Sequence, residues 1–125
     1  MIGLDSTFII DFLRGNENAI KIIERQNEQF AITPINIYEV YLGFFLSKRL
    51  PEKIHEFFES LELFEITKDA SIFAAKVSSE LVKSGKMMEA TDIIIASTFL
   101  AKGCSKILTK DEAFKRIKGV EVLRY

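Results

Sequence analysis

The amino-acid sequence predicts a single α/β domain over residues 1–125, built on a central, mostly parallel sheet of about five strands flanked by helices. Three observations favour this fold class. The length is that of one domain, short apolar runs alternate with longer helical runs, and only two prolines and six glycines interrupt the chain. Strands that alternate with helices are typical of a parallel sheet whose faces are covered by helices.

Each predicted element has a local signal. Gly15 separates the first two helices, with Asn16 as N-cap of the second, and Pro34 fits the first turn of the third. Asp69 is expected to open a later helix that ends near Gly85. The predicted strands cover about 1–5, 30–33, 63–66, 106–108 and 120–123, and the predicted helices about 7–14, 16–27, 34–46, 51–61, 69–85, 89–102 and 112–117.

The composition excludes several classes of protein. An apolar content of 48% fits a folded core rather than a disordered chain, and the lone Cys104 excludes an internal disulfide framework and fits a reducing compartment. Since no segment resembles a targeting signal or a membrane span, we expect a cytoplasmic protein. A net charge of −1 argues against a basic protein that coats nucleic acid, but not against a local site acting on it.

Four acidic residues stand where such a fold places its sites. Ligands of parallel α/β sheets bind beyond the carboxyl ends of the strands. Asp5 ends the first strand, Asp111 follows the fourth, and Asp92 precedes a buried apolar run. Glu39 lies early in the helix after the second strand, among apolar neighbours, so its carboxylate must be paired or bound to a cation. We therefore expect four carboxylates near one edge of the sheet.

Each aspartate also has a purely structural interpretation, because Asp is a common helix cap and Asp5, Asp92 and Asp111 all lie near predicted helix starts. Four clustered carboxylates, however, resist ionisation unless a cation lies between them. Oxygen ligands of this kind suit Mg²⁺ or Mn²⁺, whereas no His or Cys cluster fits zinc. Without these four acids the chain would carry a formal charge of +3.

Four short motifs follow one another along the chain: Leu4-Asp5-Ser6-Thr7; Thr33, Asn36, Glu39 and Gly43; Asp92-Ile93-Ile94-Ile95-Ala96; and Thr109, Asp111, Phe114 and Ile117. In this order they resemble the PIN-domain endoribonucleases, in particular the VapC toxins of toxin–antitoxin pairs. The resemblance extends from residue 2 to about residue 123, and only the middle, about 48–80, matches in pattern alone.

The resemblance implies an RNase whose four acids hold one or two Mg²⁺ ions, with Mn²⁺ as a substitute. One ion would activate the attacking water and the other would stabilise the leaving oxygen, giving a 5′-phosphate and a 3′-hydroxyl. Asp5 and Asp92 are the expected direct ligands, Asp111 a second-metal or water-mediated ligand, and Glu39 either a ligand or a group that orients water. Ser6, Thr7 and Thr109 could hydrogen-bond these acids, or serve only in turns and caps, and Glu89 could join the site or simply favour its helix start.

The helix after residue 34 is apolar nearly all round, so it predicts a subunit or partner interface, unless Phe57 and Phe58 of the following helix cover it. The resemblance implies a homodimer and a small VapB-like antitoxin in addition to the RNA substrate. Two other functions remain open: a PIN nuclease of RNA maturation or decay without antitoxin, and a non-cleaving PIN-like module that binds RNA or protein. Candidate contacts for RNA or an acidic antitoxin tail are Arg14, Arg25, Arg49 and Arg116.

Overall fold

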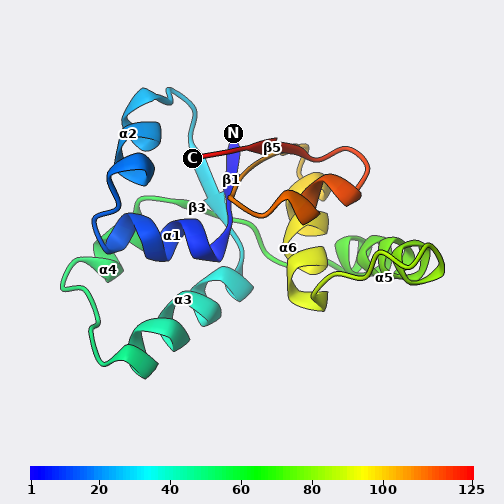
Figure 1. The fold of residues 1–125 in the computed structure, drawn as a ribbon, viewed down its shortest axis with the longest axis horizontal. Helices are drawn as coiled ribbons and strands as arrows, with labels where there is room; N and C mark the ends of the chain where they lie inside the picture. Colours follow the sequence, from blue (N-terminus) through cyan, green and yellow to red (C-terminus); the bar gives the residue numbers. More distant parts are fainter.

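The computed structural model describes residues 1–125 and contains one five-stranded sheet with helices on both faces (Figure 1). Its predicted α/β class is confirmed, and no helix is both long and apolar enough to cross a membrane. In chain order the elements are β1 (Ile2–Leu4), α1 (Ser6–Leu13), α2 (Glu17–Arg25), β2 (Phe30–Ile32), α3 (Pro34–Ser47), α4 (Ile54–Glu59), β3 (Glu62–Leu63), α5 (Lys68–Lys83), α6 (Ala90–Ala101), β4 (Lys106–Leu108), the 3-10 helix η1 (Glu112–Arg116) and β5 (Glu121–Leu123).

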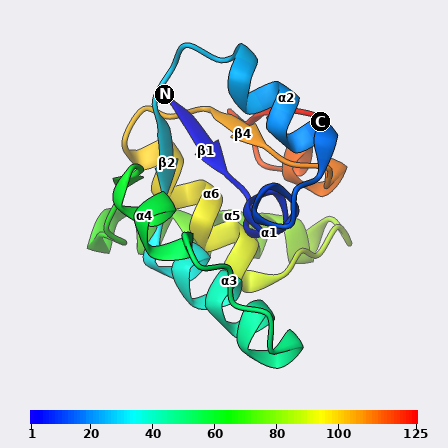
Figure 2. The ribbon, with the colours of Figure 1, turned by 90° about the vertical axis from the view of Figure 1, so that its left-hand side faces the viewer.

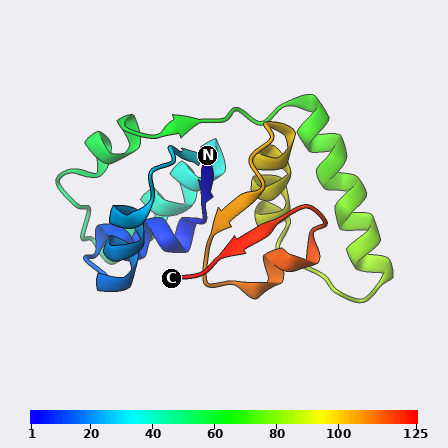
Figure 3. The same ribbon diagram turned by 90° about the horizontal axis from the view of Figure 1, so that it is seen from above.

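All neighbouring strands of the sheet are parallel, in the order β3-β2-β1-β4-β5. Figure 2 shows β1 between β2 and β4, and Figure 3 shows β4 beside β5 with α5 at the outside of the molecule. The chain proceeds from β1 towards β3 on one side and then returns to β4 and β5 on the other. The direction of winding therefore changes between β1 and β4, which is where open parallel sheets form their ligand sites.

The helix starts follow the capping signals of the sequence, with one exception. The Asn16 side chain accepts a hydrogen bond from the Ala19 amide at 3.0 Å, as predicted. The predicted start of α5 at Asp69 was wrong, because the Thr67 hydroxyl caps the helix by accepting from the Ala70 amide at 3.1 Å. Asp69 instead lies in the first turn, where a carboxylate interacts favourably with the helix dipole.

The middle of the chain deviates most from prediction. The strand predicted at 63–66 is only Glu62–Leu63, and the helix predicted at 51–61 is Ile54–Glu59. Both elements lie at the margin of the fold, because β3 pairs only with β2 at the edge of the sheet. Short elements at an edge form few hydrogen bonds, so apolar pattern alone overestimates their length.

Alternate residues of the central strands face two separate cores. Ile2 and Leu4 of β1 pack with residues of α1, α3 and α4, whereas Ala31 of β2 and Ile107 of β4 pack with residues of α5 and α6. Gly3 lies between them against α6, where a Cβ atom would be 2.5 Å from the Phe99 ring. This close approach fixes the position of α6 against β1.

Candidate active site

The four predicted acids come from four different segments that meet at the carboxyl edge of the sheet. Asp5 follows β1, Asp111 follows β4 at the start of η1, Asp92 is in the first turn of α6, and Glu39 is in α3. A cavity of about 230 Å³ is lined by Asp5, Thr7, Asp92, Lys110 and Asp111. The parallel sheet brings these residues together because its strands all end at the same edge.

Asp5 is the most buried of the four acids, with 6% of its surface exposed. It occupies the N-cap position of α1, but its side chain makes no capping hydrogen bond. Its Oδ2 instead accepts a hydrogen bond of 2.6 Å from the Thr109 hydroxyl. Burial raises the pKa of the Asp5 carboxyl, although the Thr109 hydrogen bond acts in the opposite direction. The capping interpretation was therefore wrong for Asp5, whose carboxylate faces the cavity.

The Glu39 carboxylate is held by hydroxyl groups and forms no ion pair with a basic side chain. The Ser6 hydroxyl donates to Oε1 at 2.8 Å, and the Thr91 hydroxyl lies 3.5 Å from Oε2. The buried Asn36 amide in turn donates to Ser6 Oγ at 2.9 Å and to the Leu4 carbonyl at 3.2 Å. This chain of hydrogen bonds ties α3 to the end of β1 and orients the Glu39 carboxylate.

Asn36 and Thr91 were not predicted as site residues. Asn36 belongs to a capping box, in which Thr33 and Asn36 each hydrogen-bond the other's backbone amide, so its sequence signal is that of a helix start. Its contact with Ser6 depends on the packing of α3 against β1, which no local pattern reveals.

Asp92 forms neither a hydrogen bond nor an ion pair. Burial raises the pKa of its carboxyl from 3.8 to about 7, and the negative charges of Asp5, Glu39, Asp111 and Glu89 add to the effect. The helix cap at this point is the exposed Glu89, whose side chain makes no capping bond. Asp92 is therefore not the N-cap of α6, although it does lie in the first turn, as its structural interpretation expected. Glu89 lies near enough to contribute to the raised pKa of Asp92 without lining the cavity.

Asp111 does act as a helix cap. Its Oδ1 accepts a hydrogen bond of 2.9 Å from the Ala113 amide, while its own amide donates to Thr109 Oγ1 at 2.9 Å. The buried Thr109 hydroxyl therefore connects Asp111 with Asp5. The other carboxylate oxygen of Asp111 has no partner, so capping and a role in the cavity are compatible.

Lys110 was also missed by the sequence reasoning. It lines the cavity, its Nζ is 3.7 Å from Asp11 Oδ2, and it lies 4.7 Å from the centre of the Tyr125 ring. The Tyr125 hydroxyl donates to Asp11 Oδ2 at 2.6 Å, and burial together with Asp11 raises the pKa of that hydroxyl. Tyr125 thus positions Lys110, the one basic side chain that lines the cavity. This contact joins residues far apart in the chain and has no sequence signature.

The donor set fits a hard divalent cation. None of the four acids forms an ion pair, and the groups that contact them are hydroxyls and a backbone amide. No three His, Cys, Asp or Glu side chains converge on one point at coordinating distances. Asp5, Asp92 and Asp111 nevertheless share a cavity, and neighbouring carboxylates contribute to the raised pKa of Asp5 and of Asp92, which is the electrostatic setting that a cation relieves.

Comparison with known proteins agrees with this architecture. The family model described as "PIN domain" matches residues 2–120. Two ribonucleases of Methanocaldococcus jannaschii are similar in sequence. VapC3 is 30% identical over 77% of this chain and 95% of its own length, and VapC2 is 31% identical over 98% of this chain and 92% of its own.

Solved structures share the fold over the whole chain. VapBC2 from Rickettsia felis, bound to a promoter DNA fragment, matches with a TM-score of 0.83 and 21% identity, covering 100% of this chain and 99% of that one. DNA-bound VapBC from Salmonella typhimurium matches with a TM-score of 0.82 and 22% identity, covering 98% and 96%. Together with the family match and the sequence relatives, these findings show that the chain belongs to the PIN-domain family and is of the VapC type.

Proposed function

We propose that this protein is a Mg²⁺-dependent endoribonuclease and the toxin of a VapBC-type toxin–antitoxin pair. The proposal rests on one main observation. Asp5, Glu39, Asp92 and Asp111 lie together at one edge of the sheet, and no basic side chain forms an ion pair with any of them. Repulsion between four carboxylates gives no stability to a sheet edge that has only a structural role, whereas a metal-dependent phosphodiesterase requires clustered carboxylates to bind its cation. The ribonuclease names of the two sequence relatives support RNA as the substrate.

Asp5, Asp92 and Asp111 would hold Mg²⁺, with Mn²⁺ as a substitute. When bound, the ion supplies positive charge for the phosphate and lowers the pKa of water. The protein's own contribution is positional. Thr109 fixes Asp5 and the backbone of Asp111, and Ser6 fixes Oε1 of Glu39, leaving that carboxylate to act as a ligand or to orient the attacking water.

The decisive experiment measures cleavage of RNA by the wild type, by Asp5→Asn and by Asp69→Asn, each with Mg²⁺ and with EDTA. Asp69→Asn removes the same charge from an exposed position in α5 and serves as the matched control. We expect cleavage by the wild type and the control only with Mg²⁺, and none by Asp5→Asn. Cleavage that persists in EDTA or in Asp5→Asn would contradict the metal site.

The toxin role requires an antitoxin, and several structural neighbours are toxin–antitoxin complexes. Expression of the wild type alone should arrest bacterial growth, and Asp92→Asn should relieve the arrest. RNA cleavage without growth arrest, together with the absence of a small reading frame directly upstream, would favour a nuclease of RNA maturation or decay. RNA binding without cleavage would favour the non-cleaving module.

Helix α3 supports the expected homodimer. Phe58 stacks on Tyr41 with 5.6 Å between ring centres, so α4 covers one side of α3 as the alternative interpretation required. It leaves Tyr38, Phe45 and Leu46 uncovered, with exposed fractions of 65%, 61% and 75%. Side chains of this size on one helix are typical of a protein interface. Sedimentation of the wild type should give a dimer, and Leu46→Lys should weaken it.

A further inference from the structure

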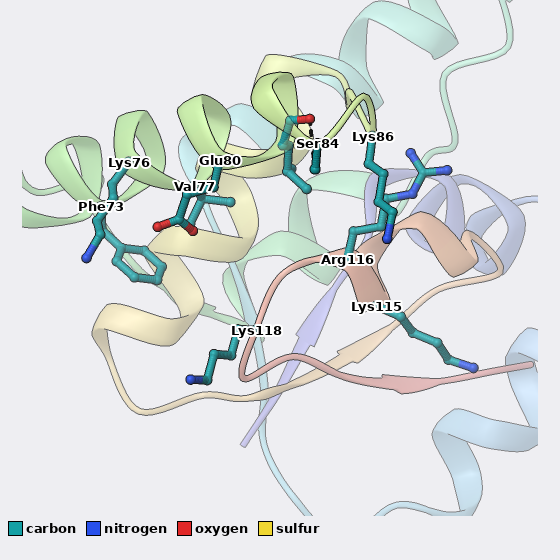
Figure 4. Close-up of a pocket in the computed structure, with 10 residues that line it drawn as sticks. Phe73, Lys76, Val77, Glu80, Ser84, Lys86, Lys115, Arg116 and Lys118 are labelled. Carbon is teal, nitrogen blue, oxygen red and sulfur yellow. Dashed lines mark hydrogen bonds between the residues drawn. The ribbon is translucent and has the colours of Figure 1, made fainter.

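A basic groove lies between α5 and the η1 region, away from the four acids. Its volume is about 720 Å³, within the range of sites that bind ligands. We define this α5–η1 groove by its five cationic side chains, which Figure 4 shows on both walls. They are Lys76 and Lys86 from α5 and the turn after it, and Lys115, Arg116 and Lys118 from η1 and the turn that follows.

Most of the positive charge in the groove is uncompensated. Lys76, Lys86 and Lys118 form no ion pair, and Arg116 donates only to the Met87 carbonyl, at 3.0 Å. Lys115 alone is neutralised, by Glu112 at 2.6 Å. In a chain whose net charge is −1, such a local excess marks a surface that attracts an extended anion.

The groove combines this charge with an aromatic side chain. Phe73 lines its far end and is 39% exposed, and Glu80 is the only acid in the lining. Figure 4 places Lys76 and Phe73 on one wall and Lys118 opposite them. A positive groove with an accessible ring is the arrangement by which proteins bind single-stranded nucleic acid, since phosphates contact the cations and a base stacks on the ring.

One end of the groove is formed by segments that adjoin the candidate active site in the chain. Arg116 stands at the end of η1, which begins beside Asp111, and five residues of 3-10 helix correspond to roughly 10 Å. Arg116 contacts Met87 in the segment that leads directly into α6 and Asp92. One end of the groove is therefore close to the carboxylate edge. Along α5, Lys76 and Ser84 are about 12 Å apart, room for roughly three or four stacked nucleotides.

We infer that the α5–η1 groove binds the phosphate backbone of the single-stranded RNA substrate beyond the bond that is cut. The inference rests on the proposed ribonuclease function, since RNA is the anion that must pass the carboxylate edge and continue beyond it. The groove thereby supplies the affinity for polyanion that the acidic edge itself does not provide.

The test compares two double variants that remove equal charge. Lys76→Gln/Lys118→Gln neutralises opposite walls at the end of the groove remote from the acids, and Lys21→Gln/Lys53→Gln removes two exposed lysines elsewhere. All four side chains are exposed, so both variants should fold. Binding of a fluorescent single-stranded RNA of about twelve nucleotides is measured in EDTA across a salt series.

We expect the groove variant to bind about tenfold more weakly at low salt, with a log–log salt slope reduced by about 1.4, because each lost phosphate contact contributes about 0.7. The control should bind as the wild type does. A third variant, Phe73→Leu, should bind at least fivefold more weakly without a change of slope, because it removes stacking but no charge.

Unchanged affinity and slope in the groove variant, or equal losses in the control, would overturn the inference. It would also be overturned if a polyglutamate peptide, but not RNA, bound to the wild type and lost affinity in the groove variant, since the groove would then serve an acidic protein segment. Failure of the ribonuclease proposal gives a different result. In that case RNA would still bind through the groove but remain intact when Mg²⁺ is added.

Discussion

The two edges of the sheet treat carboxylates in opposite ways. At the amino edge, Glu28 lies 3.2 Å from the N-terminal ammonium and 3.1 Å from Lys106 Nζ, and these cations lower the pKa of its carboxyl. At the carboxyl edge, Asp5 and Asp92 have no cationic partner, and burial raises the pKa of both. The same fold thus compensates a charge at one edge and accumulates charge at the other.

The difference separates a carboxylate that is neutralised within the chain from carboxylates that the chain leaves without a cationic partner. Glu28 links the starts of β1, β2 and β4 through two ion pairs, both formed within the chain. At the other edge, the hydroxyls of Ser6 and Thr109 orient the carboxylates of Glu39 and Asp5 but neutralise neither charge. Oriented carboxylates without a cationic partner are what the proposed Mg²⁺ site requires.

Among the changes that distinguish the two edges of the sheet, we expect the largest effect on catalysis. Thr109→Val removes the hydroxyl that donates to Asp5 and accepts from the Asp111 amide, so we expect RNA cleavage to fall roughly 10–100-fold. Thr109→Ser retains the hydroxyl and should keep most of the activity. Steady-state cleavage assays at saturating Mg²⁺ measure both. Equal activity in the Val and Ser variants would show that the hydroxyl does not orient the site.

A medium effect is expected on the pH dependence of stability in the metal-free protein. The pKa of Asp92 is about 7 when folded and 3.8 ordinarily, so the folded state binds the proton more tightly and the free energy of unfolding falls as pH rises through this range. Asp92→Asn should reduce that fall, as measured by urea unfolding in EDTA at about pH 5 and about pH 8. If the free energy of unfolding of Asp92→Asn had the same pH dependence as that of the wild type, ionisation of Asp92 would not be what destabilises the folded protein at high pH.

The smallest effect is expected at the amino edge, where the pH dependence of stability has the opposite sign to that of Asp92. The lowered pKa of Glu28 means that its contribution to stability is present above its ordinary pKa of 4.5 and disappears as pH falls through the folded value. Glu28→Gln should therefore lose a little stability at neutral pH and leave cleavage unchanged. Thermal unfolding at neutral pH and the cleavage assay test both statements. A loss of cleavage would mean that the two edges are coupled.

Sequence reasoning found the strands and helices that build the carboxyl edge, because their apolar periodicity and their caps are local signals. The strand Lys106–Leu108 was predicted with its observed bounds, and Pro34 opens α3 as expected. It misjudged β3 and the start of α5, where an edge strand and a competing threonine cap decide the bounds. Local pattern is weakest where few tertiary contacts determine an element.

The sequence by itself determined the parallel α/β fold and the gathering of the four acids at one edge of the sheet, since the strand ends in such a sheet converge whatever their detailed packing. Only the tertiary structure revealed that Asn36 supports Ser6, that Tyr125 holds Lys110 through Asp11, and that α5 and η1 enclose a basic groove. These contacts join residues far apart in the chain. Their partners are chosen by the packing of whole elements, which no short stretch of sequence encodes.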